Sequence, residues 1–296
     1  MRNVKFISNL KGFSGCTVSL YSENHTHFVR KISKSLEYNP RLKAQIDKQQ
    51  FFLTNIAKGK ITAPRIIKSG FLGDLLYFDM EYIQGVNLVQ YIYDANTSEL
   101  KEISHELGNI INIMKNSVKE EFLNPALMLN KIEDIQSSLI NKNFNLDLSK
   151  LDELKILMSA INLSANTKKT FCHGDLTMEN VLVDKSQKRY YLIDFLDSFI
   201  DHYWFDISKL FQDIEGKWYK FRNPEIILEN MNSKMIFLNE SLQNEVLKEE
   251  ILYSQNHNLF LALNFARILP YASSEDMPYL MSTIEENINK FKNNID

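Results

Sequence analysis

Glycine positions constrain the fold of this chain more than any other single feature. Only 9 glycines and 6 prolines occur among its 296 residues, roughly half the shares that are usual in globular proteins. Because both residues interrupt helices, so few of them indicate a helix-rich chain. No glycine lies between Gly108 and Gly174 or after Gly216. This distribution predicts a sheet with tight turns near the start of the chain and helices over most of the remainder.

The first 83 residues fit the sheet part of this prediction. Short runs of β-branched or aromatic residues, separated by turn residues, predict five strands. They are Phe6–Leu10, Thr17–Tyr21, Thr26–Ile32, Arg65–Ile67 and Leu75–Ile83. Asn39-Pro40 places a capping side chain directly before a proline, which predicts the start of one helix that continues to about Ala57.

After Gly85 the apolar spacing becomes helical. Leucines, isoleucines and a methionine recur every three or four residues and predict a long helix over Ser98–Val118. Further helices are expected over Leu127–Ile140, over Leu151–Ile161 and from Trp204 onward, with strands inserted over Thr170–Ser198. The chain is therefore expected to combine a small sheet with a larger helical part.

Composition narrows the class of protein. Hydrophobic residues make up 44% and charged residues 24%, as in ordinary soluble domains. The net charge of −3 does not indicate a nucleic-acid partner. No apolar run is long enough to span a membrane, the first residues lack a secretory signal, and Cys16 and Cys172 are too few for a disulfide framework. We expect a cytoplasmic protein without a nucleic-acid or membrane partner, and make no prediction of its oligomeric state.

The most informative segment runs from Phe171 to Phe195. It contains His173-Gly174-Asp175, then Asn180, an apolar run, a polar turn and a second apolar run that ends at Asp194. Two short strands around such a turn bring Asn180 and Asp194 back together. An amide oxygen and a carboxylate at neighbouring strand ends form a site suited to Mg²⁺.

This segment resembles the core of the aminoglycoside phosphotransferase and choline kinase-like family, which has a protein-kinase-like fold. The family pattern is His-Gly-Asp, four residues, Asn, and a strand ending Ile-Asp-Phe. The resemblance implies a bilobal α+β fold, with a small antiparallel-sheet lobe carrying one helix over 1–83 and a mainly helical lobe over 84–296. It implies that Asp175 is the catalytic base and that Asn180 and Asp194 hold Mg²⁺ on the phosphates of ATP or GTP.

The same resemblance assigns a nucleotide-binding loop and lysine. Gly12, Ser14 and Gly15 lie between the first two strands, where glycines let backbone N–H groups approach phosphates; a plain hairpin turn is the alternative. Val29 and Lys31 share one face of the third strand. They match the residue that covers adenine and the lysine that reaches the phosphates, although a surface lysine would show the same pattern.

Three further assignments follow from the family pattern. Gln49 occupies the helix position where the family has a glutamate that pairs with the lysine, and it cannot neutralise the charge. The segment Glu81, Tyr82 and Ile83 resembles the hinge whose backbone binds adenine. His173 and Asp206 are expected to fix the shape of the catalytic loop.

The acceptor is less constrained. Asp197 is a candidate to face the acceptor, with a solvated loop acid as the alternative. A small-molecule hydroxyl fits best, on a sugar, aminoglycoside, amino-alcohol or sugar nucleotide. A Ser/Thr protein kinase is an alternative, but Gly174 replaces the expected arginine and Asp206 follows Asp194 by only twelve residues. A second alternative is a pseudokinase module that binds a nucleotide without turnover, because Gln49 replaces the glutamate of the family pattern.

Overall fold

The computed structural model describes residues 4–10, 12, 15–142, 147–161, 167–221, 223 and 225–294. These residues form two compact units, one of residues 1–91 with 179–197, the other of residues 92–178 with 198–296. The units differ from the predicted division at residues 83 and 84. The hairpin within 179–197 joins the first unit because its strands hydrogen-bond to strands from the first 91 residues.

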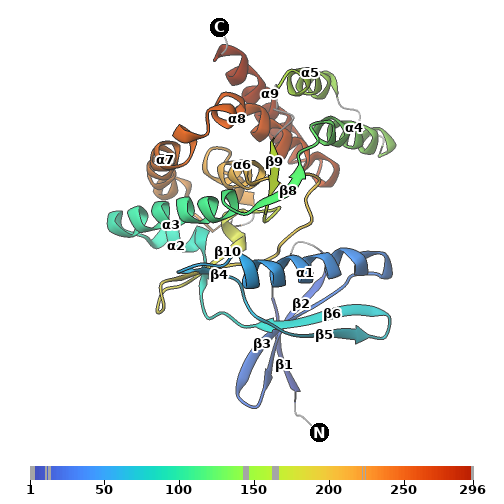
Figure 1. The fold of residues 1–296 in the computed structure, drawn as a ribbon, viewed down its shortest axis with the longest axis vertical. Coiled ribbons are helices and arrows are strands. Elements are labelled where there is room, and N and C mark those ends of the chain that lie inside the picture. Colours follow the sequence, from blue (N-terminus) through green and yellow to red (C-terminus); the bar gives the residue numbers. More distant parts are fainter. Residues whose placement is uncertain are drawn as a thin grey trace. The chain divides into compact units, whose positions relative to one another are not determined.

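The first unit contains a five-stranded antiparallel sheet in the order β1-β2-β3-β6-β5. Its strands are β1 (Val4–Asn9), β2 (Thr17–Glu23), β3 (Thr26–Ile32), β5 (Ile66–Leu72) and β6 (Leu75–Glu81). The helix α1 (Asn39–Asn55) lies across this sheet (Figure 1). The sequence therefore predicted the number of strands in this sheet and its one helix.

The helix α1 packs on the sheet through an apolar core. Leu42 and Ile46, one turn apart, belong to one buried cluster with Val29, Phe78 and Met80 of the central strands. Burying such side chains contributes roughly 1.5–3 kcal/mol each. This packing holds β3, which carries Lys31, beneath α1.

A second sheet of the first unit has the order β4-β11-β10-β7. Its strands are β4 (Ile61–Thr62), β7 (Val86–Asn87), β10 (Val181–Asp184) and β11 (Arg189–Leu192). The antiparallel pair β10 and β11 is the predicted hairpin, with Val181 opposite Leu192. Gly85 directly precedes β7, and a Cβ atom there would lie 2.6 Å from the Val183 carbonyl oxygen, so the close approach requires glycine.

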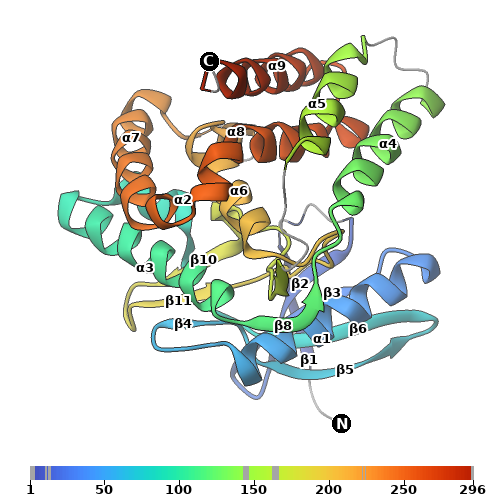
Figure 2. The ribbon, with the colours of Figure 1, turned by 45° about the horizontal axis from the view of Figure 1, so that its top comes forward.

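The second unit is mainly helical. Its helices are α3 (Thr97–Lys115), α4 (Ala126–Asn141), α5 (Ser149–Ser159), α6 (Tyr203–Ile214), α7 (Leu228–Glu245), α8 (Ile251–Ala266) and α9 (Met277–Asn293), while α2 (Leu88–Asp94) straddles the division. A two-stranded ribbon joins β8 (Val118–Phe122) to β9 (Lys168–Thr170). Single turns of 3₁₀ helix lie at 218–221, 247–249 and 269–271 in this unit, at 36–38 in the first unit and at 178–180 across the division. Figure 2 shows α8 and α9 side by side.

The helix α6 forms the core of the second unit. All twelve of its residues are buried, and α3, α7 and α8 contact it. His202 precedes the helix and its Nδ1 accepts a hydrogen bond from the Trp204 N–H. Burial lowers the pKa of His202 to about 3, so this capping imidazole stays neutral at neutral pH. Because α6 is buried and packed by three helices, its charged residues lie on a rigid element.

The α+β bilobal fold predicted from the sequence is confirmed. The long helix expected over Ser98–Val118 is α3, and it begins after Asn96, whose side chain accepts from the Ser98 and Glu99 N–H groups. Within the described ranges, no helix combines the length and the apolar character needed to cross a bilayer.

Candidate active site

The hairpin of the first unit returns Asn180 to the residues just before Asp194. The Ile193 N–H donates to the Asn180 carbonyl oxygen at 3.0 Å, directly beyond the last rung of the β10–β11 ladder. Asp194 then adopts a φ of +58°, a left-handed conformation that is unfavourable for most residues. Strain of this kind is concentrated at functional positions.

Lys31 of β3 provides the partner of this aspartate. Its Nζ lies 2.8 Å from Asp194 Oδ1, and the lysine side chain is only 1% exposed whereas the aspartate side chain is 33% exposed. Val29 is buried on the same side of the strand, as alternation predicts. Arg30 lies on the opposite face, where it makes a bidentate pair with Asp79 at 2.6 and 2.8 Å.

The Gln49 side chain hydrogen-bonds to a backbone carbonyl oxygen rather than to Lys31. This side chain is buried in α1, and its Nε2 donates to the Pro64 carbonyl oxygen at 2.7 Å. The carboxylate that neutralises Lys31 is Asp194 instead. A glutamine amide satisfies a buried backbone carbonyl well, because it donates without carrying a charge.

The predicted nucleotide loop lies between β1 and β2. Gly15 adopts a φ of +76°, and a Cβ atom on Gly12 would lie 3.2 Å from Val18 Cγ2. Ser14 lies outside the described residues. The Leu10 N–H donates to the Val18 carbonyl oxygen at 2.8 Å and closes the start of the loop.

The predicted hinge follows the end of β6. The Glu81 N–H donates to the Arg65 carbonyl oxygen at 2.9 Å, and the Ile83 carbonyl oxygen accepts from the Gly85 N–H at 3.0 Å. Ile83 is buried, while the Tyr82 ring is exposed and contacts the His27 ring edge-on. These contacts anchor the backbone of the segment on both sides.

In the second unit, Asp206 holds the loop that carries Asp175. This carboxylate, in the first turn of α6, accepts from the His173 N–H at 2.6 Å, the Gly174 N–H at 2.9 Å and the Cys172 thiol at 3.3 Å. Gly174 has a φ of +91°, which favours glycine. The loop-fixing geometry predicted for Asp206 is present. His173 is fully buried, and its Nδ1 accepts from the Asp175 N–H at 3.3 Å.

Asp175 forms an ion pair with Lys209 of α6. The Nζ–Oδ1 distance is 3.1 Å, and the side chains are 10% exposed for the lysine and 29% for the aspartate. Burial raises the pKa of the Asp175 carboxyl, but Lys209, together with Arg267 and His173, lowers it by more. The pKa therefore lies below its usual value, and the carboxylate remains charged.

Two charged residues of α6 that contact this loop, Lys209 and Asp213, were not singled out by the sequence analysis. Asp213 Oδ2 accepts from the Met178 N–H at 2.7 Å and holds the far end of the loop. Lys209 and Asp213 follow Asp206 by three and seven residues, so all three share one face of the helix. That spacing is the signal that could have found them. Asp197, the candidate acceptor residue, is exposed in the irregular segment after β11.

A hard-oxygen metal fits the donor set of the first unit. Asn180 and Asp194 provide an amide oxygen and a carboxylate. In the part of the chain that the structure describes, no cluster of three or more histidine, cysteine or acidic side chains forms a self-sufficient metal site. Mg²⁺ is commonly bound by one or two protein oxygens, with phosphates and waters completing the shell. The residues present suit that type of site.

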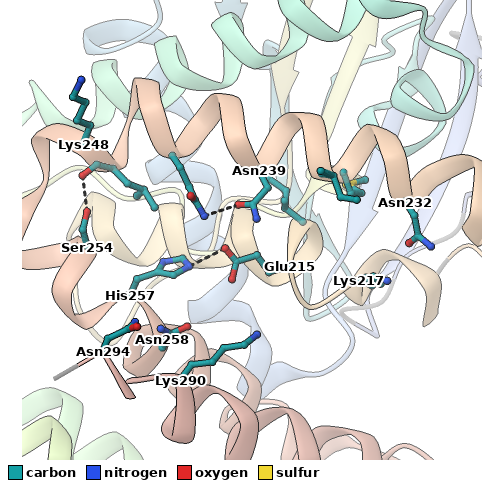
Figure 3. A pocket seen from close by; sticks show the side chains of 15 residues that line it. Glu215, Lys217, Asn232, Asn239, Lys248, Ser254, His257, Asn258, Lys290 and Asn294 are labelled. Atoms are coloured by element: carbon teal, nitrogen blue, oxygen red, sulfur yellow. Dashed lines mark hydrogen bonds and ion pairs between the residues drawn. The ribbon is translucent and has the colours of Figure 1, made fainter. Parts of the chain in front are cut away.

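A pocket of about 830 Å³ lies elsewhere in the second unit, between α7, α8 and the end of α9 (Figure 3). His257 Nε2 and Glu215 Oε1 lie 3.3 Å apart in its wall. None of the described residues that line it was predicted for catalysis, nucleotide binding or metal binding.

Together, the antiparallel sheet with its buried lysine, the Asn–Asp hairpin and the clamped aspartate loop define a protein of the kinase-like class. A sequence model described as the phosphotransferase enzyme family matches residues 8–226. The chain therefore belongs to the phosphotransferase enzyme family, as the motif resemblance indicated.

Two solved structures support the same fold. An ethanolamine kinase from Plasmodium vivax aligns with a TM-score of 0.58 and 15% identity, over 98% of this chain and 84% of that one. A type VIII aminoglycoside-3'-phosphotransferase aligns with a TM-score of 0.53 and 11% identity, over 97% and 94%. The Cydia pomonella granulovirus kinase PK-1 aligns with a TM-score of 0.38 and 15% identity. The alignment covers 65% of this chain and 50% of that kinase. None of the curated proteins compared is significantly similar in sequence.

Proposed function

We propose that this protein transfers the γ-phosphoryl group of ATP, in the presence of Mg²⁺, to a hydroxyl group of a small molecule. GTP is the alternative donor. The observation that carries the proposal is the Lys31–Asp194 ion pair of 2.8 Å, with the Asn180 carbonyl oxygen hydrogen-bonded at the adjacent Ile193 N–H. A buried ammonium paired with a carboxylate suits a phosphate group that carries a divalent cation, and the backbone hydrogen bond keeps Asn180 on the same hairpin as Asp194.

Each nucleotide-binding residue has a distinct proposed task. The Lys31 ammonium binds phosphate oxygens, and the backbone N–H groups near Gly12 and Gly15 bind the same anion. Val29 covers one face of the base. The anchored backbone at residues 81–83 binds its polar edge.

Asn180 and Asp194 would hold the metal ion, which neutralises charge on the transferred phosphoryl group when it is bound. Asp194, which has a positive φ, lies just beyond the end of the short hairpin of β10 and β11. The hairpin is itself fixed by β4 and β7, so the two ligand side chains project from a rigid support.

Asp175 is proposed to orient the acceptor hydroxyl and to accept its proton. The low pKa of this carboxyl keeps it in the form that accepts a hydrogen bond. Asp206 and Asp213 fix the loop through its backbone N–H groups. The Asp175 side chain is therefore not needed to hold the loop and can be positioned for the acceptor hydroxyl.

A small-molecule acceptor is supported by the names of two structural neighbours, an ethanolamine kinase and an aminoglycoside phosphotransferase. The Ser/Thr protein kinase alternative requires a platform for a peptide. Only eight residues separate Asp194 from the start of α6 at Tyr203, and they form neither helix nor strand. The pseudokinase alternative arose from Gln49, but the lysine has a carboxylate partner in Asp194.

The test is ADP release from Mg-ATP with a panel of sugars, aminoglycosides, choline and sugar nucleotides. At least one acceptor should stimulate ADP release in the wild-type protein. Asp175→Asn should reduce that turnover by about 10²–10⁴-fold while nucleotide affinity, measured by calorimetry, stays within a factor of two or so of wild type.

Asp194→Asn should instead weaken Mg-ATP binding itself. The exposed Asp134 of α4 provides a matched control, since Asp134→Asn should change neither quantity. Nucleotide binding without acceptor-dependent ADP release would favour the pseudokinase. Equal loss of nucleotide affinity in both site variants would contradict the assigned roles.

A further inference from the structure

Lys48 of α1 contacts the segment that directly follows Asp194. Its Nζ donates to the Leu196 carbonyl oxygen at 2.7 Å, and the lysine is half-buried. The two residues are 148 positions apart in the sequence, and both belong to the first unit. Because Leu196 is the second residue after Asp194, this hydrogen bond restrains the backbone on the far side of the aspartate.

A ring contact on the same face of α1 adds to this restraint. Phe52 follows Lys48 by four residues, so both side chains project from one face of the helix. The centroids of the Phe52 and Phe195 rings lie 5.2 Å apart, and both rings are buried. The two residues after Asp194 are therefore both held by α1, one through an aromatic pair and one through a hydrogen bond from an ammonium group.

These contacts matter because the chain around Asp194 has no regular structure of its own. Residues 193–202, which follow β11, form neither helix nor strand. The φ of +58° at Asp194 is a conformation that surrounding contacts must maintain. The hydrogen bond from the Ile193 N–H to the Asn180 carbonyl oxygen holds the near side of the aspartate, and Lys48 holds the far side.

Gln49, the next residue of α1, faces a different part of the first unit. Its amide donates to the Pro64 carbonyl oxygen, just before β5. Successive residues of an α-helix point about 100° apart, so Lys48 and Gln49 contact different neighbours. The connection between α1 and the Asp194 segment therefore includes a lysine that the sequence pattern did not single out.

We propose that Lys48 is a positioning residue, which holds Asp194 in the conformation that binds Mg²⁺ on the nucleotide. The inference rests on the proposed function, because it takes Asp194 as a ligand of the metal ion. Lys48 acts through the backbone at Leu196 and does not itself touch the nucleotide. Without this hydrogen bond, the segment would have to become ordered when Mg-ATP binds, and the affinity for Mg-ATP would fall.

The first measurement is made on the free protein. Hydrogen–deuterium exchange, read by mass spectrometry of peptides, reports how often residues 193–197 open. In Lys48→Met, this segment should exchange roughly tenfold faster, because a hydrogen bond from a charged donor no longer opposes opening. Lys48→Arg keeps a charged donor and should stay closer to wild type. Lys43→Met is the matched control, since Lys43 is exposed on the same helix.

The second measurement is the affinity for a non-hydrolysable ATP analogue, determined by calorimetry with and without Mg²⁺. Lys48→Met should weaken binding on the order of tenfold with Mg²⁺ but less than about twofold without it, since the loss acts through a metal ligand. Lys48→Arg should restore part of the Mg²⁺-dependent affinity. The melting temperature verifies that each variant is folded. If Lys48→Met unfolds, Lys48→Gln provides the comparison.

The outcomes separate this inference from the proposed function. Faster exchange at 193–197 together with a loss of affinity only in Mg²⁺ supports the inference even if no acceptor stimulates ADP release. That result would count against the proposed phosphoryl transfer alone. The inference is overturned if exchange at 193–197 is unchanged in Lys48→Met, or if affinity is retained or falls equally with and without Mg²⁺. Wild-type protein that binds the analogue no better with Mg²⁺ than without it overturns the inference as well.

Discussion

Each unit of this protein buries a lysine against an aspartate, and the two pairs differ in what supports the carboxylate. Lys31 and Asp194 lie 2.8 Å apart in the first unit, and the aspartate has a φ of +58° at the end of a short hairpin. Lys209 and Asp175 lie 3.1 Å apart in the second unit, where Asp206 also clamps the loop.

This difference indicates two uses of the same ion pair. In the first unit, the lysine is nearly inaccessible and the aspartate is one-third exposed, so the aspartate is the more accessible member of the pair at the proposed nucleotide site. In the second unit, the loop keeps its shape through backbone hydrogen bonds to other carboxylates. Lys209 forms the ion pair with the Asp175 side chain and lowers the pKa of its carboxyl.

The largest expected effect comes from removing each lysine in turn. Lys31→Met should lower kcat/KM by on the order of 10²–10³-fold, because an electrostatic contact to the phosphates is lost, and nucleotide affinity should fall with it. Lys209→Met should lower kcat but leave nucleotide affinity unchanged. Steady-state kinetics and calorimetry measure both. The exposed Lys43 gives the control Lys43→Met, and equal loss of nucleotide affinity in the two site variants would erase the distinction.

A smaller effect is expected from the clamp. Asp206→Asn should lower the free energy of unfolding by about 1.5–3 kcal/mol, since charge-assisted hydrogen bonds to the His173 and Gly174 N–H groups are weakened, and turnover should fall because the loop loosens. Urea denaturation measures the stability, with Asp134→Asn as the exposed control. A variant with wild-type stability and turnover would show that the clamp does not set the loop's shape.

The smallest effect concerns pH. Lys209 lowers the pKa of Asp175, so in the wild type the carboxylate stays ionised as pH falls below the usual aspartate range. Lys209→Met should raise this pKa, and the acidic limb of the kcat/KM profile should move to higher pH, while its alkaline side should not move. The profile is measured at saturating nucleotide. A limb that stays at the wild-type pH would indicate that Arg267 and His173, rather than Lys209, keep Asp175 ionised.

Much of the fold was predictable because its signals are local. Period-two strands, the proline in the first turn of α1 and the regular apolar spacing of α3 depend on neighbours only a few residues away. The predicted capping role of Asn39 was wrong, because Asn39 is already helical and its side chain hydrogen-bonds to the Leu76 N–H and the Asp74 carbonyl oxygen.

The hairpin that joins Asn180 to Asp194 was also predictable from local signals. The membership of that hairpin in the first unit was not predictable, because β7 and β4 pair with it from 95 and 129 residues away (Leu182 with Asn87, Tyr190 with Ile61).

The candidate site divides along the same line. Residue order and spacing, together with the family resemblance, singled out Asp175, Asn180, Asp194 and Lys31, and their roles in the reaction stay predictions. The partners of these residues depend on the tertiary structure. Lys31 pairs with an aspartate 163 residues away, and Gln49 donates to the Pro64 carbonyl oxygen. Lys209 and Arg267 both lower the pKa of Asp175. The electrostatic interaction between two charged side chains depends on the distance between them in the folded protein, and the packing of helices and strands determines that distance.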